Sequence, residues 1–271
     1  MPAREPDPRD VLVLPAPPPD AVVRYGPHAD HVADVRLPSR GPGPLVVVIH
    51  GGFWRAEYDR AHTGHLAAAL ADLGYAVAQL EYRRTGADAE GGWPATFEDV
   101  VAGVGALPAL VAAAADALGR PAPTAGPPIV VGHSAGGHLA LWYAAHAPSD
   151  AVPGGVLALA PVADLVEAHR LDLDGGAVEA LLGGDPTARS AAYAAADPLP
   201  SISLRLPTVI LHGTTDAQVP IDLSRRFVAA AGTVDSQITL LELPEVGHFE
   251  LIDPRSAAWG KVTEALRSLR R

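Results

Sequence analysis

Short apolar runs rich in β-branched residues alternate along the chain with longer, alanine-rich stretches of helical periodicity. The run LVVVIH at Leu45–His50 is almost wholly apolar, which is typical of a strand covered on both faces. Strands that alternate with helices at this spacing predict an α/β fold, with a mostly parallel sheet of about eight strands between helices. The predicted strands are Val22–Tyr25, Val32–Leu37, Leu45–His50, Ala76–Tyr82, Ile129–Val131, Val156–Ala160, Thr208–His212 and Ile238–Leu243.

The helical segments and the loops between them indicate one domain with two additions. No shift in composition divides residues 21–271, so we expect them to form a single domain. Residues 1–20 are rich in proline and charge and are predicted to form an extended or mobile arm. Residues 162–206 lack a strong strand pattern, and we expect them to form a small cap inserted over one end of the sheet. The predicted helices are His62–Leu73, Ala95–Leu118, Ala135–Ala147, Ile221–Ala231 and Pro254–Leu269.

Composition excludes several classes of protein. Hydrophobic residues make up 48% and charged residues 19% of the 271 residues, a globular balance that excludes disorder for the body of the chain. The net charge of −11 argues against a nucleic-acid partner, which clustered cations would have to bind. The absence of cysteine excludes disulfides and thiolate chemistry.

We expect no signal peptide and no apolar stretch near the ~20 residues that span a bilayer, hence a cytoplasmic protein without a membrane partner. Its oligomeric state is left open, a homodimer included.

The strongest local signal is the segment GHSAGG, which follows an apolar run and precedes a helical one. A tight strand-to-helix turn with the pattern G-x-S-x-G lifts a serine hydroxyl out of the sheet, and glycines give that turn room. Ser134 is therefore the candidate nucleophile. The amide groups at the start of the next helix, beginning with Ala135, would face the oxyanion that forms on a substrate. The alternatives are a plain glycine-rich loop and a phosphate loop, which would require a lysine that this segment lacks.

A second glycine-rich segment, HGGFW, directly follows the predicted strand Leu45–His50. Loops of this type donate backbone N–H groups to an oxyanion, and we assign that role to Gly52 and Phe53. The alternative is an ordinary glycine turn at the end of a strand. Trp54 and Phe53 are expected to line the pocket for the acyl or leaving group.

A serine nucleophile needs a base, and the base needs an acid that orients it. After G-x-S-x-G, the acid and then the histidine follow in chain order. Asp216 follows the predicted strand Thr208–His212, and His248 follows Ile238–Leu243. Because ligands bind at the carboxyl ends of parallel strands, these loops are expected to converge on Ser134.

Other residues compete for these roles. Asp164 is the alternative acid and Glu245 a weaker one, and His133 is an unfavoured alternative base because the turn should direct its side chain elsewhere. We expect His133 and Asp164 to line the substrate pocket. The H-x-x-H pairs at residues 28 and 31 and at residues 62 and 65 lack an evident third ligand, so no metal site is predicted.

Taken together, HGGFW, GHSAGGHLA, HGTTDAQVP and EVGHF make residues 20–271 resemble an α/β-hydrolase-fold serine hydrolase. The first two motifs resemble the kynurenine formamidase (arylformamidase) branch and the neighbouring small carboxylesterases. The resemblance implies hydrolysis through an acyl-enzyme, with no metal or organic cofactor. These patterns also occur in acetyl and feruloyl esterases, so they do not define the substrate. The resemblance matches Ser134, Asp216 and His248 to the family's triad, and Gly52, Phe53 and Ala135 to its oxyanion positions.

We therefore expect a hydrolase whose partner is a small-molecule carboxylic ester or aryl N-formyl amide. A strict arylformamidase acting on N-formylkynurenine is one alternative, and a catalytically silent binding module is another. The presence of all three triad groups favours an enzyme. The cap, with Phe53 and Trp54, predicts a compact, partly aromatic pocket that accepts short acyl groups on a bulky leaving group.

Overall fold

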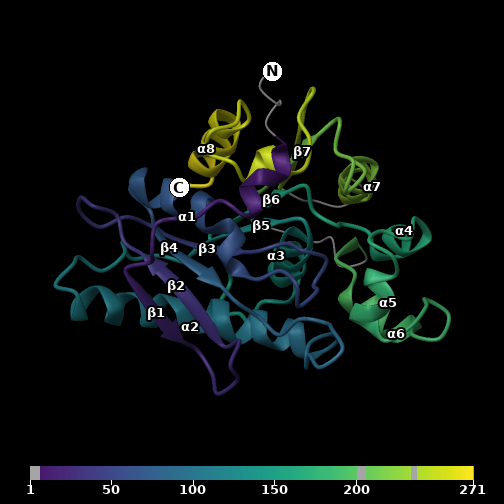
Figure 1. Cartoon of the computed structure of the whole chain (residues 1–271), viewed down its shortest axis with the longest axis horizontal. Helices are drawn as coiled ribbons and strands as arrows, with labels where there is room; N and C mark the ends of the chain where they lie inside the picture. The colour runs from purple at the N-terminus through teal and green to yellow at the C-terminus, as the bar shows by residue number, and fades with distance from the viewer. Residues whose placement is uncertain (1–6, 200–205, 233–236, 271) are drawn as a thin grey trace, which may run out of the picture.

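The computed structural model, which describes residues 7–199, 206–232 and 237–270, has a single eight-stranded sheet as its central layer (Figure 1). The strand order is β1-β2-β4-β3-β5-β6-β7-β8. Both pairings of β2 are antiparallel, and the remaining pairs are parallel, which confirms the predicted fold class. The strands are β1 (Ala21–Arg24), β2 (Val32–Arg36), β3 (Leu45–Ile49), β4 (Ala76–Leu80), β5 (Ile129–His133), β6 (Gly155–Leu159), β7 (Thr208–Gly213) and β8 (Ile238–Leu243).

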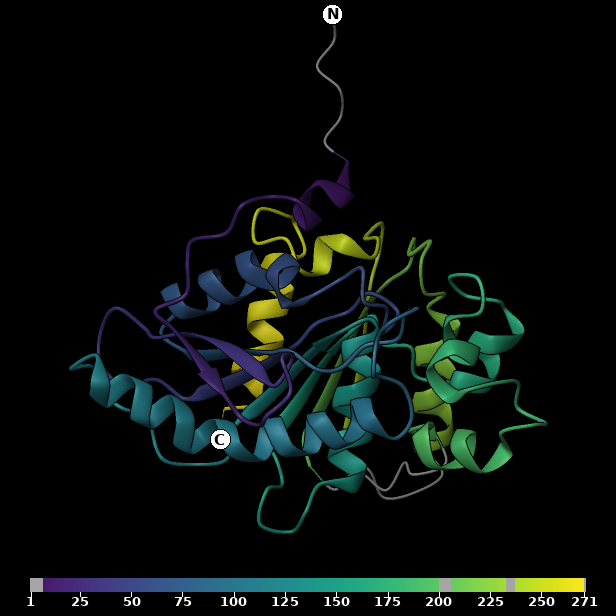
Figure 2. The same ribbon diagram turned by 60° about the horizontal axis from the view of Figure 1, so that its bottom comes forward.

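Helices cover both faces of the sheet (Figure 2). The α2, α3 and α7 helices pack on one face, and α1 and α8 pack on the other. The helices α4, α5 and α6 form a group beside the sheet, in the segment predicted as a cap (Figure 1). The described helices are α1 (Gly64–Asp72), α2 (Ala95–Ala117), α3 (Ala135–His146), α4 (Leu165–Arg170), α5 (Ala177–Leu182), α6 (Ser190–Ala196), α7 (Asp222–Ala231) and α8 (Trp259–Ser268), with 3-10 helices η1 (Pro8–Leu12), η2 (Arg60–Thr63) and η4 (Phe249–Leu251).

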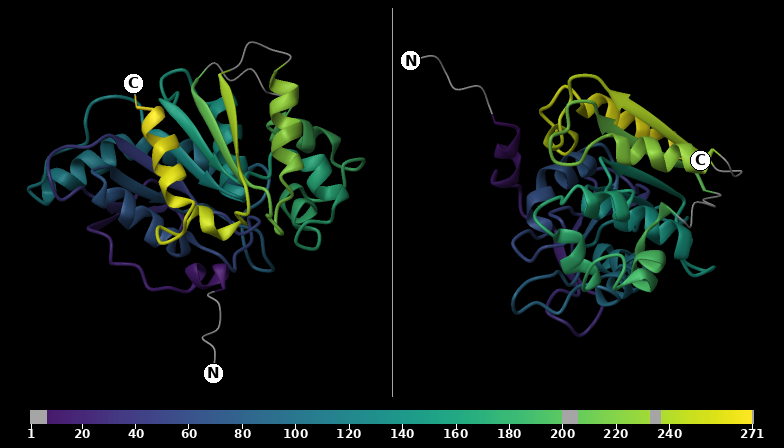
Figure 3. Two further views of the ribbon diagram at one scale, coloured as in Figure 1. Left: turned by 90° about the horizontal axis from the view of Figure 1, so that it is seen from above. Right: turned by 90° about the vertical axis from the view of Figure 1, so that its right-hand side faces the viewer.

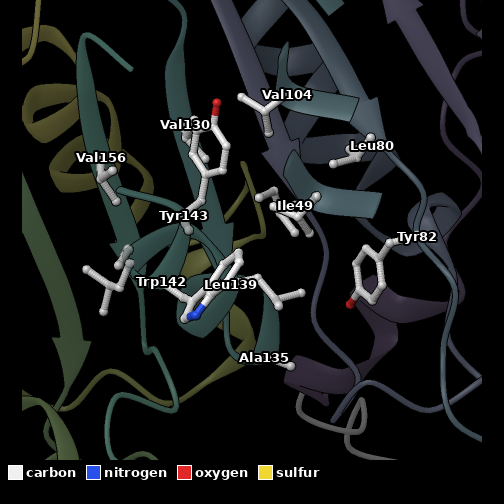
Figure 4. Packing of buried hydrophobic residues seen from close by; sticks show 14 of the residues in the cluster. Ile49, Leu80, Tyr82, Val104, Val130, Ala135, Leu139, Trp142, Tyr143 and Val156 are labelled. Atoms are coloured by element: carbon white, nitrogen blue, oxygen red, sulfur yellow. The ribbon is translucent and has the colours of Figure 1, made fainter. Parts of the chain in front are cut away.

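The alternation of side chains along β3 explains why the sheet is buried on both sides. Val47 and Ile49 belong to the cluster under α2 and α3, whereas Val46 and Val48 belong to the cluster under α1 and α8. All five residues of β3 are buried, as its continuous apolar run predicted. Figure 4 shows Ile49 close to Leu80 and Leu139, so that β3, β4 and α3 share one packed layer.

Helix α2 is long and apolar enough to cross a membrane by length and composition alone, contrary to the expectation that no apolar stretch approaches this length. One of its faces, including Phe97, Val104 and Val111, is buried against the sheet. The core helix of a soluble protein can have the same length and hydropathy. Pro108 lies inside α2, which continues past it as one helix.

The N-terminal segment was predicted to be an extended or mobile arm, and this prediction is wrong for residues 8–12. Pro8–Leu12 form the 3-10 helix η1, whose first turn is capped by the Asp7 carboxylate. Val11 is 1% exposed and packs into the core cluster that contains α1 and α8. Figure 3 shows η1 beside the loops that lead into α8. Burial of Val11 stabilises the attachment of this segment to the domain, and the proline-rich composition alone does not predict that contact. Residues 1–6 of the predicted arm lie outside the described residues.

The segment predicted as a cap, residues 162–206, connects β6 to β7 and includes α4, α5 and α6. Leu165, Leu181 and Tyr193 from these helices are buried in the main core cluster, so the segment is fixed to the domain by apolar packing. Residues 200–205 at its end lie outside the described residues. A salt bridge from Asp174 to Arg55 (2.5 Å) joins this segment to the loop after β3.

A buried carboxyl group lies at the base of the same segment. Asp197 accepts hydrogen bonds from the backbone N–H groups of Leu165 (3.0 Å) and Leu199 (2.9 Å). Burial raises the pKa of Asp197 from its ordinary 3.8 to about 6, and the charge of Asp164 acts in the same direction. The folded protein therefore holds a proton on Asp197 at pH values where the unfolded chain has released it.

This raised pKa predicts a loss of stability as the pH rises. Protonated Asp197 contributes to the free energy of unfolding in full below about pH 4. This contribution, about 3 kcal/mol in total, is lost as the pH rises through about 6. Asp197→Asn keeps the side chain uncharged and should remove the loss. Urea unfolding of both proteins at about pH 4 and about pH 8 should show the variant gaining up to about 3 kcal/mol relative to the wild type at the higher pH. A difference in unfolding free energy that does not depend on pH would contradict this assignment.

Candidate active site

The serine of GHSAGG lies on a sharp turn between β5 and α3. Ser134 has φ 56° and ψ −118°, a conformation that a non-glycine residue adopts only when its surroundings hold it there. Neighbouring glycines make the turn sterically possible. A Cβ on Gly132 would lie 2.1 Å from the carbonyl oxygen of Gly136, and a Cβ on Gly136 would lie 2.1 Å from that of Ile49. The turn therefore depends on glycine on both sides of Ser134.

The HGG loop (residues 50–54) follows β3 and lies against this turn. Gly52, Phe53 and Trp54 have φ values of 101°, 48° and 59°, so three consecutive residues adopt positive φ. A Cβ on Gly51 would lie only 3.0 Å from the Cβ of Ser134, which measures how closely the two backbones approach. The backbone groups of Gly52 and Phe53 are thus held beside the serine, and Ala135 begins helix α3 at the same place.

Ser134 lines a cavity of about 150 Å³. The loops around it follow β3, β5, β7 and β8, at the carboxyl ends of the strands, where open α/β sheets bind their ligands. Histidine, aromatic and charged side chains share its wall. The cavity is lined by Arg9, Leu12, Gly52, Phe53, Tyr58, His62, His133, Ser134, Asp174, Gln218, His248 and Phe249.

His248 and Asp216 are joined by a hydrogen bond of 2.6 Å between Nδ1 of the imidazole and Oδ2 of the carboxylate. Because the carboxylate accepts, Nδ1 carries the proton, and Nε2 of a neutral His248 is left as the base. The backbone N–H groups of Gln218 (2.8 Å) and Val219 (2.9 Å) donate to Oδ1 of Asp216. His248 lines the cavity that Ser134 also lines. The structure therefore pairs His248 with Asp216 and brings His248 and Ser134 to one cavity wall.

The carboxylate of Asp216 is strongly stabilised as an anion. Burial raises the pKa of Asp216, but hydrogen bonds from His212 and His248 outweigh it and hold the pKa well below its ordinary range. His212 is itself fixed, since Nε2 donates to the carbonyl of Val219 (2.9 Å) and Nδ1 faces the hydroxyl of Ser224 (2.7 Å). Asp216 consequently keeps its negative charge throughout the neutral pH range.

The histidine at the start of the HGG loop is part of a buried ion pair. His50 places Nε2 2.8 Å from the Glu81 carboxylate and Nδ1 2.8 Å from the carbonyl oxygen of Gly51. Both ring nitrogens of His50 therefore face an oxygen acceptor. Burial raises the pKa of Glu81, but the charge and hydrogen bond of His50, with help from Arg84, lower it below the ordinary value. The His50 ring, paired with Glu81 and stacked on Tyr82, thus fixes the start of the HGG loop.

We expect Glu81→Gln to destabilise the protein by about 3 kcal/mol or more, because it removes the buried carboxylate that pairs with His50 and Arg84. Urea unfolding at neutral pH measures this loss. The matched control is Glu264→Gln, which removes an exposed carboxylate paired with Lys261 at 2.9 Å. That substitution should cost no more than about 1 kcal/mol. Equal losses in the two variants would contradict the ion-pair assignment.

Two residues predicted to line the pocket lie elsewhere. Trp54 is fully buried in the main core cluster and packs edge-on against His138, with ring centroids 5.2 Å apart, so its predicted pocket role is wrong. Asp164 caps α4 by accepting from the N–H of Glu167 (2.9 Å), and its other oxygen accepts from Arg226 (2.8 Å). It is therefore neither in the pocket wall nor beside His248.

His133, the third residue predicted for the pocket, does line the cavity. Its Nε2 donates to the backbone carbonyl of His248 (3.1 Å), and the two rings lie 4.5 Å apart. Burial lowers the pKa of His133 well below its ordinary value, so the ring is neutral. His133 thus holds the backbone of His248 by a hydrogen bond and packs against its ring.

Several lining residues have no recognisable signal in the sequence. Arg9 and Leu12 come from the N-terminal segment, Asp174 from the predicted cap, and Tyr58 and His62 from the loop and 3-10 helix after β3. His62 belongs to an H-x-x-H pair, but burial lowers its pKa to about 4. The other histidine of the pair, His65, is not among the cavity-lining residues and places Nε2 2.8 Å from the carbonyl oxygen of Leu14. Among the residues that the structure describes, no group of three or more potential metal ligands occurs.

The sheet order and the serine turn at the end of β5 place the chain in the α/β-hydrolase fold. The BD-FAE family model matches residues 33–230, and the chain belongs to that family. It is 30% identical over 265 residues to the probable carboxylic ester hydrolase LipM of Mycobacterium tuberculosis (strain ATCC 25618 / H37Rv). That match covers 88% of this chain, and the chain spans 58% of the length of that relative.

Solved esterase structures have the same fold. Esterase B from Lactobacillus rhamnosis superposes with a TM-score of 0.76 at 18% identity, covering 97% of this chain and 89% of the other. A truncated carbohydrate esterase from gut microbiota gives a TM-score of 0.74 at 19% identity, with 92% and 95% covered. These comparisons support the predicted resemblance to α/β-hydrolase esterases. They bring no evidence for the arylformamidase branch, which stays a prediction.

Proposed function

We propose that this protein is a serine hydrolase that cleaves small carboxylic esters through an acyl-enzyme. The observation that carries the proposal is the 2.6 Å hydrogen bond between His248 and Asp216 in the wall of the cavity that Ser134 lines. The family match and the esterase relatives support the same class of reaction.

The proposed reaction begins with Ser134. Neutral His248 takes the proton from the hydroxyl, and the serine oxygen attacks the ester carbonyl carbon. In this proposal the N–H groups of Gly52, Phe53 and Ala135 stabilise the oxyanion, aided by the start of α3. His248 returns its proton to the departing alkoxide, and water, activated by the same histidine, then releases the acid. Asp216 keeps the proton of His248 on Nδ1 and stabilises the imidazolium.

The dimensions of the cavity favour a short acyl group. Its volume of about 150 Å³ lies below the roughly 300–1,000 Å³ of sites that enclose drug-sized ligands. Phe53, Tyr58 and Phe249 provide aromatic surface for a leaving group. We therefore propose substrates with acyl groups from formyl to butyryl.

A series of p-nitrophenyl esters from acetate to palmitate tests this proposal. The value of kcat/KM should be highest for the two- to four-carbon esters and should fall steeply beyond them, because the small cavity accommodates few additional methylene groups. A maximum at ten carbons or more would contradict the short-acyl proposal. No hydrolysis of any ester would favour the alternative of a catalytically silent binding module.

Aryl formamide hydrolysis is the second candidate, and the small cavity is the observation that favours it, since formyl is the smallest acyl group. N-formylkynurenine, assayed beside p-nitrophenyl acetate, tests whether amides are cleaved. A kcat/KM for the formamide above that for the acetate would support an arylformamidase. Ester hydrolysis without formamide turnover would leave the esterase proposal alone.

A further inference from the structure

We propose that Arg9 forms an anion subsite at the entrance of the cavity and that the preferred substrates carry a carboxylate. This inference rests on the proposed function and adds a substrate class to it. Its basis is the placement of Arg9 against both loops that carry His248 and Asp216.

The contacts of Arg9 hold it at this position. Its Nη2 donates to Oε1 of Gln218 (3.1 Å), which lies two residues after Asp216. Its guanidinium carbon lies 5.7 Å from the ring centroid of Phe249, which follows His248. The side chain is presented by η1, which is anchored by buried Val11. Arg9 is exposed to solvent, and these two contacts place its guanidinium at the rim of the cavity.

The charges in the cavity wall leave this cation uncompensated. Asp174, the carboxylate among the lining residues, is paired with Arg55 at 2.5 Å. The partners of the Arg9 guanidinium are an amide oxygen and an aromatic ring, both uncharged. Within the described residues Arg9 forms no ion pair, although Asp7 and Asp10 lie close in sequence. The Asp7 carboxylate accepts from the backbone N–H of Arg9 (2.9 Å), and Asp10 faces the charge of Arg255.

The remaining donors of Arg9 match a carboxylate. A guanidinium has five N–H donors in a planar fork, of which the contact with Gln218 uses one. A carboxylate at the rim could accept two of the others side by side, in the arrangement that arginine forms with carboxylates most strongly. Because the protein carries a net charge of −11, its overall field repels anions. A preference for an anionic substrate would therefore have to come from local attraction by Arg9, against the repulsion of the whole protein.

Two matched substrate pairs test the proposal and distinguish where the carboxylate lies. Mono(4-nitrophenyl) glutarate and its methyl ester place the charge on the acyl side. 4-Carboxyphenyl acetate and its methyl ester place the charge on the leaving group. For each pair, the ratio of kcat/KM for the anion to kcat/KM for the neutral ester isolates recognition of charge from the chemistry of Ser134.

We expect Arg9→Gln to lower this ratio about tenfold in one of the two pairs, and Arg9→Lys to give an intermediate value because it keeps the charge without the fork. Added salt should lower the ratio in the wild type and have little effect in Arg9→Gln. The control is Arg255→Gln, which removes a nearby exposed arginine that lies outside this cavity and is paired with Asp253 at 2.7 Å. Its ratios should equal those of the wild type.

Ratios in Arg9→Gln that match the wild type in both pairs would overturn the anion subsite while leaving the esterase proposal intact. An equal fall in Arg255→Gln would also overturn it, because a general field effect would then explain the preference. If the wild type hydrolyses none of the four esters, the proposed function itself fails, and the subsite fails with it. Hydrolysis of the neutral esters by each variant verifies that the variant is folded.

Discussion

Replacement of Ser134 by alanine should reduce kcat for the short p-nitrophenyl esters by a factor on the order of 10⁶. The hydroxyl is the group that attacks the carbonyl in the proposed reaction, and none of the other cavity-lining side chains is placed to replace it. The backbone of the turn is held by Gly132 and Gly136 and by the hydrogen bond from the Ser134 N–H to the carbonyl of Leu159 (2.8 Å). Because alanine keeps that N–H, we expect a folded protein with an unchanged midpoint of thermal unfolding.

Ser190→Ala serves as the control for Ser134→Ala, since Ser190 is an exposed residue at the start of α6. It should retain wild-type activity. A phosphonate ester inhibitor gives a second readout: mass spectrometry should find one covalent adduct on the wild type and on Ser190→Ala, and none on Ser134→Ala. Residual activity above about a hundredth of the wild type would reject Ser134 as the nucleophile, because nucleophile removal costs far more.

Asp216→Asn should lower kcat by roughly 10⁴. The hydrogen bonds of the Asp216 carboxylate explain this loss of activity. Oδ1 of Asp216 accepts from two backbone N–H groups, so the amide oxygen of asparagine would take that place and its NH₂ would face His248. Nδ1 of the imidazole would then have to accept, which moves the proton to Nε2 and leaves no base for Ser134. The value of KM should change far less than kcat, since the side chain of Asp216 does not line the cavity.

Asp164→Asn is the matched control for Asp216→Asn, because it changes the other aspartate that the sequence offered as the triad acid. Asp164 is paired with Arg226 and caps α4, so its loss should reduce stability and leave kcat within about tenfold of the wild type. If Asp164→Asn instead lowered kcat more than Asp216→Asn, the acid would have to be reassigned to the loop after β6.

Local patterns in the sequence determine the elements and the turn that carries the serine. The continuous apolar run at Leu45–His50 predicted β3, because a strand with helices on both faces has no polar side. GHSAGG predicted the turn at Ser134, because only glycine fits where a Cβ would meet backbone at 2.1 Å. Both features depend on residues close together in the chain. Such short-range steric and hydrophobic constraints can be recognised in the sequence without knowledge of the fold.

The choice among candidate side chains depended on how distant segments pack. Asp216 and Asp164 both follow strands. The parallel pairing of β7 with β8 brings Asp216 to His248, whereas Asp164 pairs with Arg226 of α7. The pairing of His50 with Glu81 likewise joins the ends of two neighbouring strands. No spacing rule in one sequence selects between such partners, because the contact forms only after the sheet is assembled.

The conformation of the N-terminal segment depends on tertiary contacts that its local sequence does not predict. Its proline-rich composition indicates an extended chain, and nothing in the local sequence distinguishes Arg9 from any exposed arginine. Val11 becomes buried only because the sheet and α8 provide an apolar surface for it, and that burial brings Arg9 to Gln218 and Phe249. Periodicity and steric room determined the strands and the serine turn, whereas the composition of the cavity wall followed from long-range burial that a linear pattern does not encode.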